Sequence, residues 1–206
     1  MNFDTHEKKT TPYLFYEFDD CFLPETIQEI NSIVALLDGK IDISRYNSRR
    51  DANIDRFFLT KDNISDYPAL KTAIDYLRSK ETVNKIEQFG NISLTECYLR
   101  FEIILDKETF WLEKHTDIIE KKMSCLVFIN DNNEPEENGT DLYNDKLEHV
   151  YTVPFRHNHG YMFFPSTNTW HGLEKGKPIK YRKAVLINYV TFPTDFALKG
   201  DLRHGL

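Results

Sequence analysis

The chain has 206 residues, of which 40% are hydrophobic, 29% charged and 14% aromatic, and its formal net charge is −7. This length allows one sizeable hydrophobic core. The negative charge argues against non-specific binding to DNA or to an anionic membrane, and the high aromatic content favours β structure.

The sequence pattern of the first 90 residues predicts two strands and two helical regions. In chain order these are a strand at Tyr13 to Phe18, a helix from Phe22 to Gly39, a strand at Ile54 to Thr60, and a helix or helix pair from Pro68 to Gly90. The helices are indicated by apolar residues at helical spacing and by a proline near the first position of each.

From residue 93 onward the pattern changes to strands separated by polar turns or turns that contain glycine or proline. The predicted strands are Ser93 to Leu105, Ser124 to Asn130, Gly139 to Tyr143, His149 to Val153, Gly160 to Phe164 and Tyr181 to Val190. This succession is typical of a double-sheet jelly roll, also called a double-stranded β-helix.

We therefore predict a single domain that is mainly β with flanking helices. Residues 1–90 are expected to form a supporting segment, 91–192 the jelly-roll core, and 193–206 a C-terminal tail. The start of the chain has no cationic stretch followed by an apolar run, so no signal peptide is expected. The three cysteines are far apart and include no Cys-x-x-Cys, which favours reduced thiols and a cytoplasmic protein.

A possible metal centre lies in the β region. His115-Thr116-Asp117 places an imidazole and a carboxylate two positions apart, on the same face of a strand end. His171 follows later, within Thr169 to Gly172. Two imidazoles and one carboxylate can occupy one face of an octahedron and leave positions open for other ligands, as in non-haem iron(II) oxygenases. We therefore expect His115, Asp117 and His171 to be metal ligands and to form the catalytic centre.

Other interpretations of these residues compete with this one. A chance His-x-Asp is close to an even bet in a chain with seven histidines. His157 and His159 form a His-x-His that could bind a metal, although its position just before a glycine is typical of a turn. Lys114, Lys121 and Lys122 flank the His-x-Asp and could attract an anion, but a solvated face is the simpler interpretation.

Arg182 lies eleven positions after His171, on the last predicted strand. A guanidinium there can bind the distal carboxylate of 2-oxoglutarate as a fork, which a lysine does less specifically. Only one of Arg182 and Lys183 can face inward, and the sequence leaves open which. Arg182 shares its side of the strand with Ala184, Leu186 and Asn188, whereas Lys183 shares the other with Val185, Ile187 and Tyr189.

Taken in order, these segments resemble 2-oxoglutarate/Fe(II) oxygenases of the prolyl-hydroxylase-like group. Phe110 to Asp117 resembles their first metal-binding stretch, and Trp170-His171-Gly172 and Arg182 match their distal histidine and their co-substrate anchor. The resemblance covers roughly Phe89 to Thr191 well and the earlier part of the chain loosely. It is specific for the class of reaction and not for the substrate.

The resemblance implies a dioxygenase that uses Fe(II), 2-oxoglutarate and O2, with ascorbate as a supporting reductant. It would hydroxylate a small-molecule or peptide substrate and release succinate and CO2. Collagen-type prolyl hydroxylases usually carry lysine where this chain has Arg182, and relatives with arginine often have serine where this chain has Ala184. A second hydroxyl must then bind the co-substrate carboxylate. Tyr98 is the candidate, with a plain core tyrosine as the alternative.

Three other functions stay open at this point. A cupin-like metal-binding protein or isomerase would use a similar metal site without 2-oxoglutarate. A non-catalytic binding module could keep the fold alone. A nucleic-acid dealkylase would need a basic groove with stacking aromatics, which the net charge of −7 argues against. No motif indicates the substrate or the oligomeric state.

Overall fold

The computed structural model describes residue 3 and residues 5–41, 56–108 and 110–198 of the chain. In these ranges three α-helices accompany twelve strands in two antiparallel sheets. The α-helices are α1 (Pro24–Asp38), α2 (Pro68–Leu77) and α3 (Lys80–Gly90), and short 3-10 helices span Ile64–Asp66 and Glu136–Asn138.

The large sheet has the strand order β1-β2-β9-β6-β11-β4-β12, and β3 also pairs with β4. Its strands are β1 (Glu7–Lys9), β2 (Phe15–Phe18), β3 (Arg56–Phe58), β4 (Tyr98–Lys107), β6 (Lys121–Phe128), β9 (His159–Phe163), β11 (Tyr181–Val190) and β12 (Phe196–Ala197). The small sheet has the order β5-β10-β7-β8. Its strands are β5 (Leu112–His115), β7 (Thr140–Tyr143), β8 (His149–Val153) and β10 (His171–Leu173).

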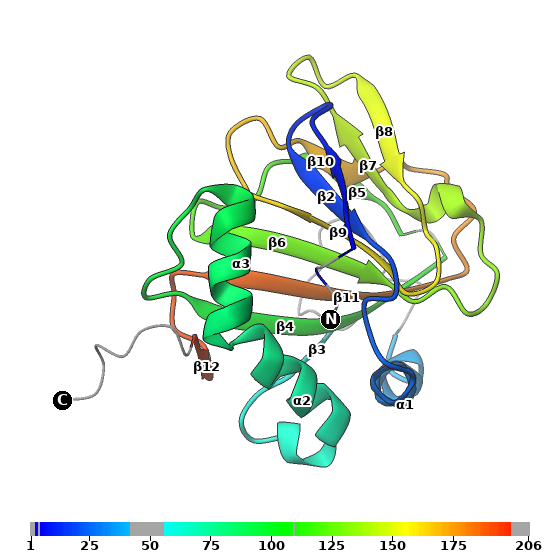
Figure 1. Ribbon diagram of the computed structural model, residues 1–206. Coiled ribbons are helices and arrows are strands. Elements are labelled where there is room, and N and C mark those ends of the chain that lie inside the picture. Colours follow the sequence, from blue (N-terminus) through cyan, green and yellow to red (C-terminus); the bar gives the residue numbers. More distant parts are fainter. Residues whose placement is uncertain (1–2, 4, 42–55, 109, 199–206) are drawn as a thin grey trace.

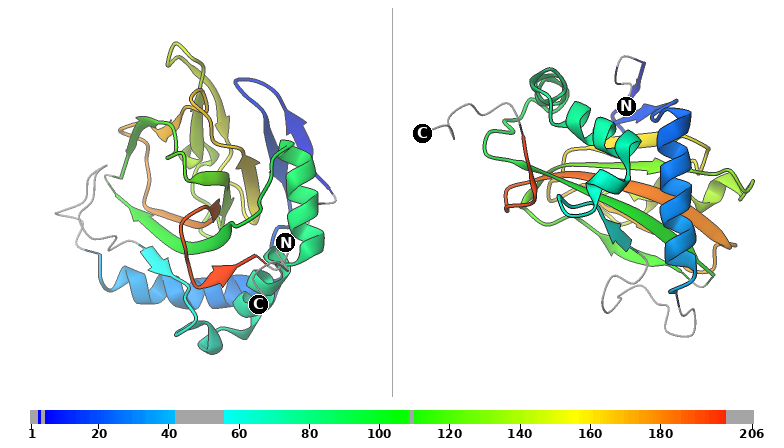
Figure 2. Two further views of the ribbon diagram at one scale, coloured as in Figure 1. Left: turned by 90° about the vertical axis from the view of Figure 1, so that its left-hand side faces the viewer. Right: turned by 90° about the horizontal axis from the view of Figure 1, so that it is seen from below.

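The elements form three layers. The helices lie on one face of the large sheet, and the small sheet packs over the other face, at the upper right of Figure 1 and at the top of the left view in Figure 2. One hydrophobic cluster fills the space between the helices and the large sheet, and a second fills the space between the two sheets. This mainly β architecture with flanking helices is the predicted jelly roll.

The central strand β11 shows how one sequence serves both hydrophobic clusters. Because side chains alternate across a strand, Val185, Ile187 and Tyr189 join the helix-side cluster, whereas Ala184 joins the cluster between the sheets. Arg182 has the same parity as Ala184 and faces the space between the sheets, which decides the alternative that the sequence left open.

Lys183 faces the helix layer instead. It is buried, and its ammonium group is hydrogen-bonded to Asn31 at 2.9 Å and paired with Asp131. A lysine can occupy this position because both partners satisfy its buried charge.

The segment from Pro68 onward is a helix pair and not one helix. Ser79 caps α3 with its side chain, which accepts a hydrogen bond from the Thr82 N–H. Asn91 takes a left-handed conformation with φ of 47° directly after the last helical residue, so it ends α3 in place of a glycine.

Strands from both ends of the chain take part in the large sheet. β1, β2 and β3 come from the predicted supporting segment and β12 from the predicted tail, and all four are paired within this sheet. The predicted division into a supporting segment, a jelly-roll core and a tail stays a prediction. Within the described ranges, no helix combines the length and the apolar character needed to cross a membrane.

Candidate metal centre

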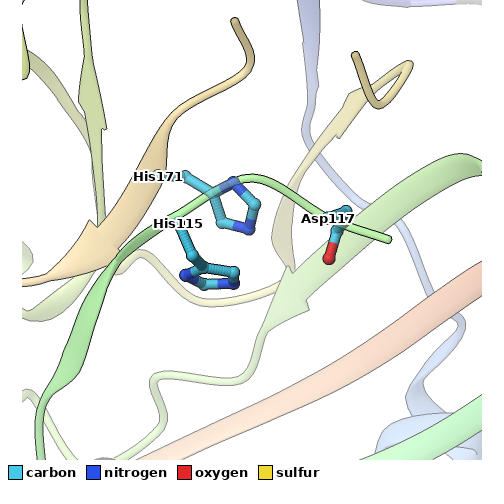
Figure 3. Close-up of side chains that lie close together, drawn as sticks. All are labelled: His115, Asp117 and His171. Carbon is cyan, nitrogen blue, oxygen red and sulfur yellow. The ribbon is translucent and has the colours of Figure 1, made fainter. Parts of the chain in front are cut away.

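The structure brings His115, Asp117 and His171 together. His115 ends β5 and His171 begins β10, and the two residues are register partners across the small sheet. Their ring centroids are 4.3 Å apart. Asp117 lies just beyond β5, and Figure 3 shows its carboxylate turned toward the two rings. One ligand atom from each residue lies within 4.8 Å of the others, and no second group of this kind exists among the described residues.

Both histidines are held with Nε2 toward the centre. Nδ1 of His115 lies 2.8 Å from the carbonyl oxygen of Glu113, and Nδ1 of His171 lies 2.9 Å from that of Thr169. A carbonyl can only accept, so each Nδ1 carries a proton and donates it, which leaves the Nε2 lone pair for a metal ion. Such hydrogen bonds fix both the tautomer and the orientation of a metal-binding ring.

Asp117 is held by two polar side chains of β6. The Lys121 ammonium group lies 2.6 Å from Oδ1 and the Ser124 hydroxyl 2.6 Å from Oδ2. Ser124 Oγ also lies 2.8 Å from the side-chain oxygen of Asn188, Oδ1. Because one hydroxyl has one proton, Ser124 can donate to only one of these two oxygens, and Asp117 Oδ2 is the nearer at 2.6 Å.

The charge states of Asp117 and His171 suit metal binding. Burial raises the pKa of Asp117, but the nearby Lys121 and His171 and the hydrogen bonds from Lys121 and Ser124 outweigh it, so the pKa is lowered overall. Burial lowers the pKa of His171 to about 4. At neutral pH the centre therefore offers an ionised carboxylate and a neutral buried imidazole, the forms in which these groups bind metals.

The three residues line a cavity of about 130 Å³ between the sheets. Its other lining residues include apolar side chains, among them Ile104, Leu126, Phe163 and Leu186, and the polar residues Arg56, Asp106, Lys121, Ser124, Thr140, Tyr161 and Arg182. The ring of Phe163 packs edge-on against that of His171, with centroids 5.0 Å apart. The three candidate metal ligands and a buried arginine thus line one largely apolar space.

Arg182 lies in this cavity and is held by three acceptors. Its Nε donates to the Asn138 carbonyl at 2.7 Å, Nη1 to Asp106 Oδ2 at 2.5 Å, and Nη2 to Thr140 Oγ1 at 3.3 Å. The guanidinium also lies over the ring of Phe128, 5.1 Å from its centroid. The Arg182 side chain is buried, and β11 is an interior strand of the large sheet between β6 and β4.

The structure does not bring Tyr98 to Arg182. Tyr98 begins β4 and is the partner of Val190, whereas Arg182 at the opposite end of β11 is the partner of Asp106. Eight residues of extended strand separate the two levels, which is about 26 Å. Tyr98 is also absent from the residues that line the cavity.

Two hydroxyls that the sequence analysis did not select are near Arg182 instead. Thr140 accepts a hydrogen bond from Arg182, and the buried Tyr161 is hydrogen-bonded through its hydroxyl to Thr140. Burial raises the pKa of Tyr161, so its hydroxyl keeps a proton that it can donate. Phe163 contacts His171, and residues two apart on a strand face the same side, so Tyr161 on β9 also faces the cavity. This alternation was the signal from which Tyr161 could have been identified.

The other candidate groups lie elsewhere. His157 is exposed, whereas His159 is buried in β9 with its Nδ1 2.7 Å from Asp19 Oδ1, so the two histidines do not form a metal site. Lys114 is exposed and its ammonium group lies over the ring of Tyr143. For Lys121 the expectation of a solvated face is wrong. Its side chain is only 16% exposed, and its ammonium group pairs with Asp117.

Gly172, next to His171, allows β5 and β10 to approach closely. A Cβ atom at this position would lie 2.8 Å from the Leu112 carbonyl oxygen on β5. Gly172→Ala is therefore expected to push β5, and His115 with it, away from His171. We expect a loss of about 1–3 kcal/mol in the free energy of unfolding, as for other overpacked sites, and weaker binding of Mn(II) in calorimetric titrations. Gly39→Ala is the control, because nothing lies within 4 Å of its added Cβ; equal behaviour of the two variants would contradict the prediction.

The low pKa of His171 predicts a pH-dependent stability of the metal-free protein. The ring has a pKa of about 4 when buried and 6.5 ordinarily, so between these values the unfolded chain binds a proton that the folded chain does not. Stability from this group is complete above pH 6.5 and falls by roughly 3 kcal/mol as the pH drops toward 4. Urea unfolding with EDTA at pH 7 and pH 4.5 should show a smaller decrease for His171→Gln; an identical decrease would contradict this origin.

Comparison with solved structures identifies proteins of similar fold. A prolyl 4-hydroxylase from Phytophthora capsici matches with a TM-score of 0.59 and 14% identity over 85% of this chain and 58% of that one. A Pseudomonas putida prolyl-4-hydroxylase matches with a TM-score of 0.58 and 12% identity over 87% of this chain and 93% of that one. The non-heme alpha ketoglutarate dependent epimerase SnoN from nogalamycin biosynthesis matches with a TM-score of 0.56 and 11% identity, over 85% and 77% of the two chains.

No family model matches the sequence, and no curated protein does so either. At identities of 11–14% the similarity to solved structures shows the fold. This chain therefore has the jelly-roll fold found in prolyl hydroxylases and in a 2-oxoglutarate-dependent epimerase, and it has a possible His-Asp-His metal site within that fold.

Proposed function

We propose that this protein is an Fe(II)- and 2-oxoglutarate-dependent dioxygenase that hydroxylates a small molecule or a peptide, with release of succinate and CO2. The observation that carries the proposal is the convergence of His115, Asp117 and His171 in the cavity that also contains Arg182. The substrate is not expected to be a nucleic acid, and the predicted location is the cytoplasm.

The donor set fits ferrous iron. Two imidazole nitrogens and one carboxylate oxygen are the protein ligands of non-haem Fe(II) oxygenases, in which other coordination positions stay open. When bound, the iron would couple the oxidative decarboxylation of 2-oxoglutarate to oxidation of a C–H bond by O2. The protein would supply binding, orientation and exclusion of water.

Each side chain has a defined task in this proposal. His115 and His171 present Nε2 because their Nδ1 atoms donate to backbone carbonyls. Lys121 and Ser124 keep Asp117 ionised and fix its orientation. These contacts hold the three ligands in place before any metal binds, so little reorganisation is needed.

Arg182 would bind the distal carboxylate of 2-oxoglutarate, and the hydroxyls of Thr140 and Tyr161 would assist it. These two groups take the part first considered for Tyr98, since they lie beside Arg182. Leu126, Leu186 and other apolar residues of the cavity wall would keep bulk water from the reacting groups.

The fold does not choose between hydroxylation and another oxidative outcome, because one protein of similar fold is described as an epimerase. The mass of the product distinguishes the two: hydroxylation adds one oxygen atom, whereas epimerisation leaves the mass unchanged. A cupin-like protein or isomerase that needs no 2-oxoglutarate would bind the metal in the same place without using Arg182.

The test is succinate formation from 2-oxoglutarate under air with ferrous iron and ascorbate. We expect slow turnover even without the substrate, which stops when iron is chelated with EDTA. The Asp117→Ala variant should lack this activity, whereas His157→Ala should retain it. Absence of succinate with correctly folded protein that binds ferrous iron would contradict the proposal.

A further inference from the structure

The proposed co-substrate anchor already has a carboxylate of the protein as its partner. Asp106 Oδ2 lies 2.5 Å from Arg182 Nη1, and the two side chains are 2% and 6% exposed. Asp106 also lines the cavity beside the arginine. The sequence analysis did not single out this residue, because the strand it predicted there ended at Leu105.

The cationic side chains of the cavity already have acidic partners. Among the described residues, three cationic side chains line it, and each is paired with an acid: Arg182 with Asp106, Lys121 with Asp117, and Arg56 with Glu102 at 2.7 Å. The positive charge of Arg182 is therefore already compensated by a carboxylate of the protein. A dicarboxylate that reaches it must lie close to the carboxylate of Asp106.

Arg182 has N–H groups left that could bind such a ligand, but the carboxylate of Asp106 would repel it. A guanidinium has five N–H groups, and hydrogen bonds to Asn138, Asp106 and Thr140 engage three of them. The other two could bind a second carboxylate. Two carboxylates that share one guanidinium in a poorly solvated cavity repel each other, and this opposes binding of the second.

We propose that Asp106 is an internal competitor for the distal carboxylate of the co-substrate, and so a residue that determines affinity for 2-oxoglutarate. This inference rests on the proposed function. Asp106 would weaken co-substrate binding, so that occupancy of the site varies with the concentration of 2-oxoglutarate and does not stay saturated at low concentrations. Asp106 would not contact the metal, so metal affinity would be independent of it.

The experiment compares wild-type protein with Asp106→Asn by calorimetric titration of 2-oxoglutarate in the presence of Mn(II), which replaces iron and requires no turnover. Asparagine keeps the shape and an acceptor oxygen for Arg182 but removes the charge. We expect the Kd for 2-oxoglutarate to fall tenfold or more and the Kd for Mn(II) to stay unchanged. Asp106→Ser, which also lacks the charge, replaces Asp106→Asn if that variant does not fold.

Two further variants control for other effects. Asp106→Glu keeps the charge and should show none of the gain. Asp131→Asn removes an acid that pairs with Lys183 on the opposite side of β11, and it should leave 2-oxoglutarate binding as in the wild type.

Unchanged or weaker binding of 2-oxoglutarate by the uncharged variants would overturn the inference alone, and would make Asp106 a support that orients Arg182. If neither wild type nor variants bound 2-oxoglutarate while all bound Mn(II), the inference and the proposed function would both fail. Tighter binding by Asp106→Glu as well would also overturn the inference, because the charge would then not be the cause.

Discussion

Replacing His171 with alanine is expected to lower the affinity for divalent metals by more than 100-fold and to abolish any 2-oxoglutarate turnover. Changes to groups that only support a ligand typically cost 10–100-fold in metal affinity, and this change removes a ligand itself. The remaining pair, His115 and Asp117, has a single imidazole. Titration calorimetry with Mn(II), together with a succinate assay, measures both effects.

The matched control is His157→Ala. His157 is an exposed histidine and is part of the His-x-His that could have been an alternative metal site. Its removal should leave metal affinity and turnover unchanged. Loss of metal binding in this variant, or retention of it in His171→Ala, would place the metal elsewhere and contradict the assigned centre.

Replacing Arg182 with methionine is expected to have the largest effect on stability. The change removes the contact of 2.5 Å between the buried Asp106 carboxylate and the guanidinium of Arg182. Breaking a buried ion pair in this way typically costs about 3–5 kcal/mol. Urea unfolding of Arg182→Met should show a loss of this size, and the double variant Arg182→Met/Asp106→Leu should recover most of it, because both charges of the Arg182–Asp106 pair are then removed.

The same variants test the role of Arg182 in binding. Both should bind Mn(II) with the affinity of the wild type, because Arg182 is not a metal ligand. Both should fail to bind 2-oxoglutarate measurably at concentrations that saturate the wild type. If the stable double variant bound 2-oxoglutarate as the wild type does, the assignment of Arg182 as the anchor would be contradicted, and a metalloprotein without this co-substrate would be favoured.

The strongly patterned strands could be predicted from the sequence because their side chains alternate between two different environments. The ends of β8 and β11 coincide with those predicted. β5 and β10 were not among the predicted strands. Their side chains include those of the candidate metal centre, and neither strand has an alternating hydrophobic pattern.

The surroundings of Arg182 show why the register of a sheet limits what can be predicted from sequence. Tyr98 and Asp106 have the same parity on β4, but only Asp106 lies at the level of Arg182. Which end of one antiparallel strand meets a given residue of its partner depends on the pairing of the whole sheet, and no local pattern encodes it. The grouping of His115, Asp117 and His171 was predicted from their chemistry and from the resemblance of their segments, and the structure brings the three side chains together. Their role as metal ligands stays a prediction.

The position of the candidate centre links the two halves of the sandwich. Both histidines belong to the small sheet, whereas Asp117 is hydrogen-bonded to Ser124 on β6 of the large sheet. An ion coordinated by all three would act as a non-covalent cross-link between the sheets. At a concentration 100 times its Kd, such an ion adds about 2.7 kcal/mol to the stability of the fold, and the short strands β5 and β10 would gain the most resistance to local separation.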